Sequence, residues 1–314
     1  MAAVPGTFID PEQLLRITDL ELLARIVTAG LMPGIHTSPK TGASVEFSQY
    51  RAYTPGDDLR LLDWKLYGRS DRLYIKQFRD ETNLHATILL DMSGSMDYGS
   101  GTVSKFAYAR MLAAALIMIL KAQGDAVGLI AYHRELVLNI PPSNRRRQMH
   151  HLFAELAKLK PADRTETPRA LQFLGDILRP RGMVILISDL LHPLSETLHH
   201  LTSLRARRHD VLIMRISDPH EASFPFEQSL TLIDAEAGAE RFVIPEAIRQ
   251  TYRQNRDAHF QTLADHARGE EIDLLECVTS TPFDRALRHF LNHRGKAPRT
   301  KGYTRTKGAA GGTS

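Results

Sequence analysis

The segment ATILLDMSGSM, residues 86–96, decides the fold, because a short apolar strand runs directly into a polar turn. Residues 105–123 follow with helical spacing and are apolar on nearly every side, as expected for a helix packed against a sheet. Apolar runs of strand length recur at 126–132, 135–140, 183–188, 210–217 and 271–277. Because helical segments separate most of these runs, the sequence predicts an α/β fold with a doubly wound, mostly parallel six-stranded sheet.

The chain divides into three predicted regions. Residues 1–84 combine a helical pattern with strand-like segments, which predicts a small N-terminal α+β region. Residues 85–294 are predicted to form the main domain, with an insertion near 218–268 that holds a hairpin and a long polar helix. Residues 295–314 form a Gly-, Thr- and Lys-rich tail that is predicted to be disordered.

The formal net charge of +4 belongs to this tail. Six Lys and Arg residues and no Asp or Glu lie between Arg294 and the end, so the remainder of the chain is slightly acidic. A solubilising end is therefore favoured over an arm that binds nucleic acid.

The sequence also favours the cytoplasm. Cys277 is the only cysteine, so no intrachain disulfide can form and a reducing compartment is expected. The first residues lack the apolar core of a signal peptide, and the most apolar run, 111–120, is too short to span a bilayer. We therefore expect a cytoplasmic protein that is not inserted in a membrane.

Two of the predicted strands end in an aspartate, Asp91 and Asp189. Ligands of doubly wound sheets bind at the carboxyl ends of the strands, and here Ser93 and Ser95 follow the first aspartate within four residues. Magnesium prefers oxygen ligands, which the two serines can supply directly while the aspartates hold metal-bound water. Such a shell leaves the positive charge poorly compensated, so the ion would accept an acidic side chain from another protein.

This pattern resembles the metal-ion-dependent adhesion site (MIDAS) of von Willebrand factor A domains. The family carries Asp-x-Ser-x-Ser, a later Thr five residues before an Ala-Leu pair, and an Asp after a buried strand. Thr165 stands five residues before Ala170-Leu171, whereas we interpret the Thr167 hydroxyl as a helix cap. The resemblance implies binding of Mg²⁺ or Mn²⁺ by Asp91, Ser93, Ser95, Thr165 and Asp189.

A second resemblance covers roughly residues 12–293. The segment RAYTPGDDLRLLDW, residues 51–64, is similar to the signature of the bacterial DUF58 family, as are Ser217-Asp-Pro219 and the segment LIDAE at 232–236. Members of that family are commonly associated with MoxR-type AAA+ ATPases, which implies such an ATPase as the partner. We interpret the charges of the first motif as structural and Trp64 as a packing anchor.

These observations predict a non-catalytic, metal-dependent module that binds a protein. The alternative is a metal-assisted hydrolase that uses the same ion to activate water. A phosphatase of the haloacid-dehalogenase type is disfavoured, because Ser93 stands where that chemistry needs a second aspartate. Binding of nucleic acid or of a membrane surface through the basic tail is the third and weakest reading.

Overall fold

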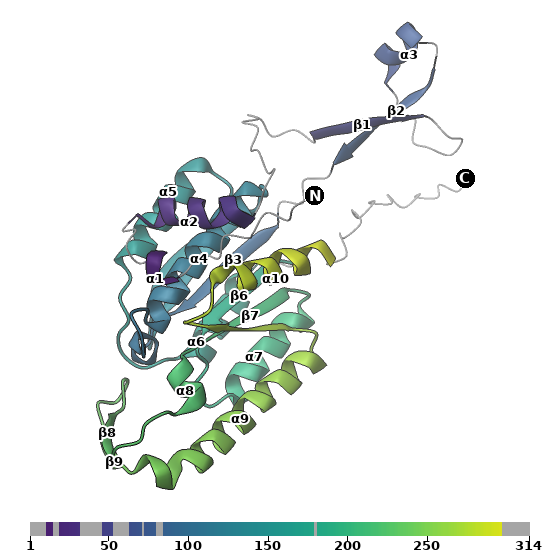
Figure 1. Ribbon diagram of the computed structural model, residues 1–314. Helices are drawn as coiled ribbons and strands as arrows, with labels where there is room; N and C mark the ends of the chain where they lie inside the picture. The colour runs from purple at the N-terminus through teal and green to yellow at the C-terminus, as the bar shows by residue number, and fades with distance from the viewer. Residues whose placement is uncertain are drawn as a thin grey trace, which may run out of the picture.

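The computed structural model describes residues 11–14, 19–31, 46–52, 63–70, 72–79, 84–178 and 181–296. A six-stranded sheet with the strand order β10-β7-β6-β3-β4-β5 lies at its centre (Figure 1). Five strands are mutually parallel, and their bounds are β3 (His85–Asp91), β4 (Ala126–Tyr132), β6 (Met183–Ser188), β7 (Asp210–Ser217) and β10 (Asp273–Val278). The remaining strand, β5 (Leu136–Ser143), pairs antiparallel with β4. This confirms the predicted doubly wound, mostly parallel sheet.

Helices cover both faces of the sheet (Figure 1). One hydrophobic cluster joins the sheet to α2 (Leu20–Leu31), α4 (Lys105–Ala122), α5 (Arg146–Lys158) and α10 (Phe283–Lys296). The other joins it to α6 (Thr167–Ile177), α7 (Ser195–Ala206) and α9 (Pro245–Gly269). Successive side chains of a strand point to opposite faces, so Ile88 and Leu90 belong to the first cluster and Leu89 to the second.

The helix α4 accounts for much of the first cluster. Most of its side chains are buried on every side of the helix, because the sheet lies on one side of α4 and α2, α5 and α10 lie on the other. This burial explains why the helix is apolar on nearly every side. None of the helices in the described ranges is long and apolar enough to cross a membrane.

An insertion follows β7. It begins with the short helix α8 (Pro219–Ser223), continues as an antiparallel hairpin of β8 (Leu230–Ile233) and β9 (Glu240–Val243), and leads into α9. In Figure 1 the hairpin lies below the sheet at the end where α8 is found. The last helix, α10, ends at Lys296, and residues 297–314 of the basic tail lie outside the described residues.

The N-terminal region contains α1 (Pro11–Leu14), an antiparallel pair of β1 (Glu46–Ala52) and β2 (Tyr74–Arg79), and α3 (Trp64–Ser70). The packing role predicted for Trp64 is wrong, because its side chain is 63% exposed and meets the Tyr67 ring edge-on. Asp63 is buried instead, and its carboxylate accepts a hydrogen bond from the Leu66 amide in the first turn of α3. The rest of the 51–64 motif lies mostly in residues 53–62, outside the described residues.

Candidate metal centre

Asp91 ends β3 and is fully buried at the carboxyl edge of the sheet. Its Oδ1 atom accepts a hydrogen bond of 2.9 Å from the Ser93 amide. Its Oδ2 atom accepts from the Ser188 hydroxyl at 2.6 Å and from the Thr165 hydroxyl at 3.2 Å. Burial, together with the negative charge of Asp189, raises the pKa of Asp91 to about 6. A cation beside these carboxylates would therefore stabilise the ionised form of Asp91.

The turn after Asp91 is held in place by neighbouring segments. The Met92 amide donates to the Tyr132 carbonyl at 2.8 Å, and the Gly94 amide donates to the Asp163 carbonyl at 2.7 Å. A 3₁₀ turn, η2 (Gly94–Asp97), follows and is anchored by the fully buried side chain of Met96. These contacts fix the conformation of the metal loop, by which we mean residues 91–97.

The two serines of the metal loop present their hydroxyls to the same point. Their Oγ atoms, of Ser93 and Ser95, lie 3.1 Å apart. Adjacent ligands in an octahedral magnesium shell are separated by about 3 Å, because each metal–oxygen bond is about 2.1 Å long. The spacing of the two hydroxyls therefore fits neighbouring positions around one ion.

Thr165 lies in the loop before α6. Its hydroxyl donates to the Asp91 carboxylate and lies 3.2 Å from the Thr167 hydroxyl. The capping role predicted for Thr167 is wrong, since Thr167 is the first residue of α6 and Glu166 precedes it as the cap residue. The fully buried Thr167 hydroxyl instead lies 3.0 Å from the Tyr132 hydroxyl. The Thr167 hydroxyl thus contacts both Thr165 and Tyr132.

Asp189, which follows β6, is bound to a buried lysine that the sequence did not single out. The Lys105 ammonium donates to its Oδ2 atom at 2.8 Å, and also to the Glu221 carboxylate in α8. Burial alone would lower the pKa of Lys105, but the charges of Asp189 and Glu221 raise it above its usual value. The signal in the sequence was a lysine at the start of a largely apolar helix.

The structure adds a further carboxylate. Glu236, in the turn between β8 and β9, accepts a hydrogen bond of 3.3 Å from the Thr165 amide. The LIDAE segment marked this residue in the sequence, but nothing in the sequence placed it near the metal loop. Asp91, Ser93, Ser95 and Thr165 are thus linked by hydrogen bonds, while Asp189 is close enough for its charge to act on both Asp91 and Glu236.

The oxygen atoms gathered here fit a hard divalent cation. They combine neutral hydroxyls with carboxylates, the donor set that Mg²⁺ and Mn²⁺ accept. The described part of the chain holds no cluster of three or more His, Cys, Asp or Glu side chains that could hold a metal ion by themselves. An ion at the metal loop would therefore need the hydroxyl groups of the site as ligands. Ligation of a metal by the five predicted residues stays a prediction.

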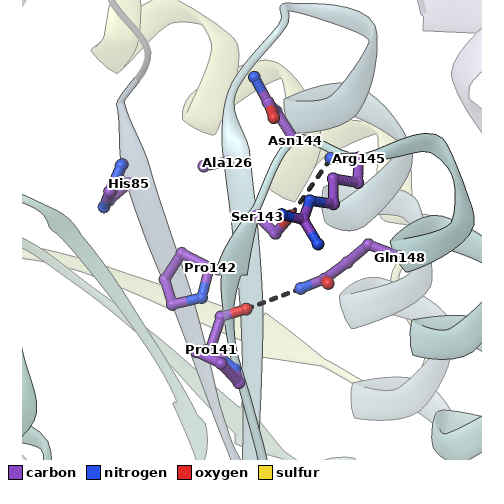
Figure 2. A pocket seen from close by; sticks show the side chains of 8 residues that line it. All are labelled: His85, Ala126, Pro141, Pro142, Ser143, Asn144, Arg145 and Gln148. Carbon is purple, nitrogen blue, oxygen red and sulfur yellow. Dashed lines mark hydrogen bonds between the residues drawn. The ribbon is translucent and has the colours of Figure 1, made fainter.

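A pocket lies at the other end of these strands. It has a volume of about 500 Å³ and is lined partly by His85 and Ala126, the first residues of β3 and β4. Figure 2 shows Gln148 reaching across it to donate to the Pro141 carbonyl at 2.7 Å. Because Asp91 ends the strand that His85 begins, this pocket and the metal loop lie at opposite edges of the sheet. The pocket is therefore separate from the candidate site.

Known proteins resemble the chain over most of its length. A family model described as "Protein of unknown function DUF58" matches residues 49–262. The uncharacterized protein Rv1480 of Mycobacterium tuberculosis (strain H37Rv) is 29% identical over 278 residues, which is 87% of each chain. The uncharacterized protein Mb1516 of Mycobacterium bovis has the same identity and coverage.

Solved structures resemble the described fold more distantly. The conserved hypothetical protein BatB from Bacteroides thetaiotaomicron has a TM-score of 0.46 at 14% identity and covers 68% of this chain and 100% of its own. The SpRpn10 VWA domain has a TM-score of 0.40 at 13% identity, with coverage of 66% and 95%.

Proposed function

Because the chain belongs to the DUF58 family, and because its hydroxyl and carboxylate side chains converge at the carboxyl edge of the sheet, we propose that it is a non-catalytic protein-binding module that depends on a divalent metal. The observation that carries the proposal is the meeting of Ser93, Ser95 and Thr165 around Asp91. Two segments that are distant in the sequence supply these groups, so the arrangement is a property of the fold. Mg²⁺ or Mn²⁺ is the proposed ion.

The residues of the site would have two different roles toward the ion. The hydroxyls of Ser93, Ser95 and Thr165 would contact the ion, and Asp91 and Asp189 would accept hydrogen bonds from its water. The ion supplies a positive charge that attracts an acidic side chain at the remaining position. Ser188, which donates to Asp91, would orient that carboxylate.

The contacts of the three hydroxyls support a binding role. Among the described residues, no histidine or lysine is hydrogen bonded to the hydroxyls of Ser93, Ser95 or Thr165, and the two serines contact each other. The Asp91 carboxylate that Thr165 contacts also accepts hydrogen bonds from Ser93 and Ser188, so it is engaged in holding the site together. We therefore favour binding over hydrolysis.

The proposed partner is a MoxR-type AAA+ ATPase that supplies an acidic side chain. This part of the proposal comes from the family resemblance. The proposed compartment is the cytoplasm, in agreement with a single, buried cysteine, Cys277.

The test is a pull-down of a purified MoxR-type ATPase from the same genome by the full chain. We expect capture in Mg²⁺, loss of capture in EDTA, and capture reduced at least about tenfold by Ser93→Ala. Ser229→Ala, which removes a hydroxyl from an exposed loop residue, is the matched control and should bind as the wild type does. Circular dichroism should show that both variants are folded.

Two results would contradict the proposal. One is undiminished capture by both Asp91→Ala and Ser93→Ala. The other is turnover of phosphate or ester substrates that requires Mg²⁺ or Mn²⁺ and disappears with Asp91→Ala, since this would establish the hydrolase instead.

A further inference from the structure

Glu236 differs from every other residue in its part of the hairpin. Residues 231–242 are all exposed except this one, which is half-buried. The hairpin therefore makes little contact with the body of the protein along its length. Its turn, by contrast, directs one carboxylate toward the metal loop.

The turn is built to hold that carboxylate in position. The Asp234 Oδ1 atom accepts hydrogen bonds from the amides of Glu236 at 2.8 Å and Ala237 at 2.9 Å. The Gly238 amide donates to the Asp234 carbonyl at 2.8 Å, and Gly238 has a positive φ of 68° that suits glycine. An Asx turn of this kind fixes the backbone without help from a partner.

The same turn touches the metal loop directly. A Cβ atom placed on Gly94 would lie 2.4 Å from the Ala235 carbonyl oxygen. The two backbones are therefore so close that a side chain at position 94 would collide with the hairpin turn. The Thr165 amide then donates to the Glu236 Oε2 atom. Glu236 thus contacts the segment that supplies the third hydroxyl of the site.

Glu236 lies among other polar groups of the site. Its carboxylate contacts the Thr165 amide and the Ser95 hydroxyl, and Asp189 is close enough for its negative charge to act on Glu236. A carboxylate beside other carboxylates is unfavourable unless a positive charge lies between them. An ion held by Ser93, Ser95 and Thr165 would supply that charge, and Glu236 already contacts two of these three residues.

We propose that Glu236 is a metal ligand supplied by the chain itself, in the position that an acidic residue of a partner takes when the partner binds. The inference rests on the proposed function and adds a regulatory element to it. The hairpin then acts as an internal competitor, whose effective concentration at the ion is high because it belongs to the same molecule. A partner must displace Glu236 before it can bind the ion.

The test uses Mn²⁺ as the probe and the full chain as the protein. Titration calorimetry gives the Mn²⁺ affinity, and water proton relaxation reports how much water is bound to the ion. For Glu236→Gln we expect an affinity about tenfold weaker and a higher relaxation per bound ion, because water replaces the carboxylate. Glu240→Gln, which removes the same charge from an exposed position of the same hairpin, should leave both values unchanged.

The outcomes separate this inference from the proposed function. If Ser93→Ala loses Mn²⁺ while Glu236→Gln matches the wild type in either readout, Glu236 is not a ligand and the proposed function stands. An equal loss of affinity in Glu240→Gln would also overturn the inference, since the effect would then be one of net charge. If the wild type binds no Mn²⁺, or Ser93→Ala binds it equally well, the metal-dependent function fails and the inference fails with it.

Discussion

The Lys105 ammonium donates a hydrogen bond of 2.8 Å to the Asp189 carboxylate, although neither side chain is more than 2% exposed. Its second contact, with Glu221, joins α8 to the same ion pair. Three elements, α4, the end of β6 and α8, are thereby held together beside the metal loop. A buried charge is stable only when it is paired in this way, so Lys105 couples the fold to the site.

Lys105→Met tests that coupling. Its replacement leaves two carboxylates without their cation, and the free energy of unfolding should fall by about 3 kcal/mol. Urea denaturation followed by circular dichroism measures the change. Lys158→Met serves as the control, because Lys158 also pairs with a carboxylate at 2.8 Å but is 69% exposed, and it should have no measurable effect. Equal stability of the two variants would contradict the role given to Lys105.

Gly94→Ala tests the contact between the metal loop and the hairpin turn. The added methyl group would collide with the Ala235 carbonyl, so the hairpin must move away and the protein should lose about 1–3 kcal/mol of stability. Hydrogen exchange should become faster at residues 234–238. Gly101→Ala is the control, since a Cβ atom there meets nothing within 4 Å. Unchanged exchange in the hairpin of Gly94→Ala would show that the two segments are not in contact.

Thr167→Val tests the corrected role of Thr167. The change keeps the shape of the side chain and removes the hydroxyl that the buried Tyr132 contacts, which should cost about 1–2 kcal/mol. Because the two hydroxyls act on each other, Tyr132→Phe combined with Thr167→Val should cost less than the sum of the single changes. Thermal or urea unfolding of the three variants completes the cycle. Strict additivity would argue against a direct hydrogen bond.

His192 makes stability depend on pH. Burial lowers its pKa from the ordinary 6.5 to about 4, and the charge of Asp189 only partly offsets this. Between these values the unfolded chain binds a proton that the folded chain does not, so His192 reduces stability as the pH falls from about 6.5 to about 4, by up to about 3 kcal/mol. The raised pKa of Asp91 acts in the opposite direction over part of this range.

Comparison of the wild type with a variant that lacks His192 removes the effect of Asp91, because both proteins contain Asp91. His192→Gln does not titrate, so its stability relative to the wild type should improve as the pH is lowered from 7 to 4.5. Urea denaturation of both proteins at the two pH values gives the difference. Parallel changes in the two proteins would contradict the assignment.

The sequence by itself determined the sheet and the residues at its carboxyl edge. Alternating apolar strands and helical segments specify parallel strands, and parallel strands bring their ends together, so Asp91 and Asp189 had to lie at one edge. Ser93 and Ser95 follow Asp91 within four residues, so they had to lie at the same edge of the sheet. The hairpin and α9 were also predictable, because local turn and helix signals mark both.

Only the tertiary structure decided which side chains meet the metal loop from elsewhere. Lys105 is 84 residues from Asp189, and Thr165 is 71 residues from Glu236, so no local pattern links either pair. Thr167 looked like a helix cap because capping is a local interaction, whereas its actual neighbour, Tyr132, belongs to the strand β4. Local propensities determine the elements, but the partners of a buried polar group depend on how those elements pack.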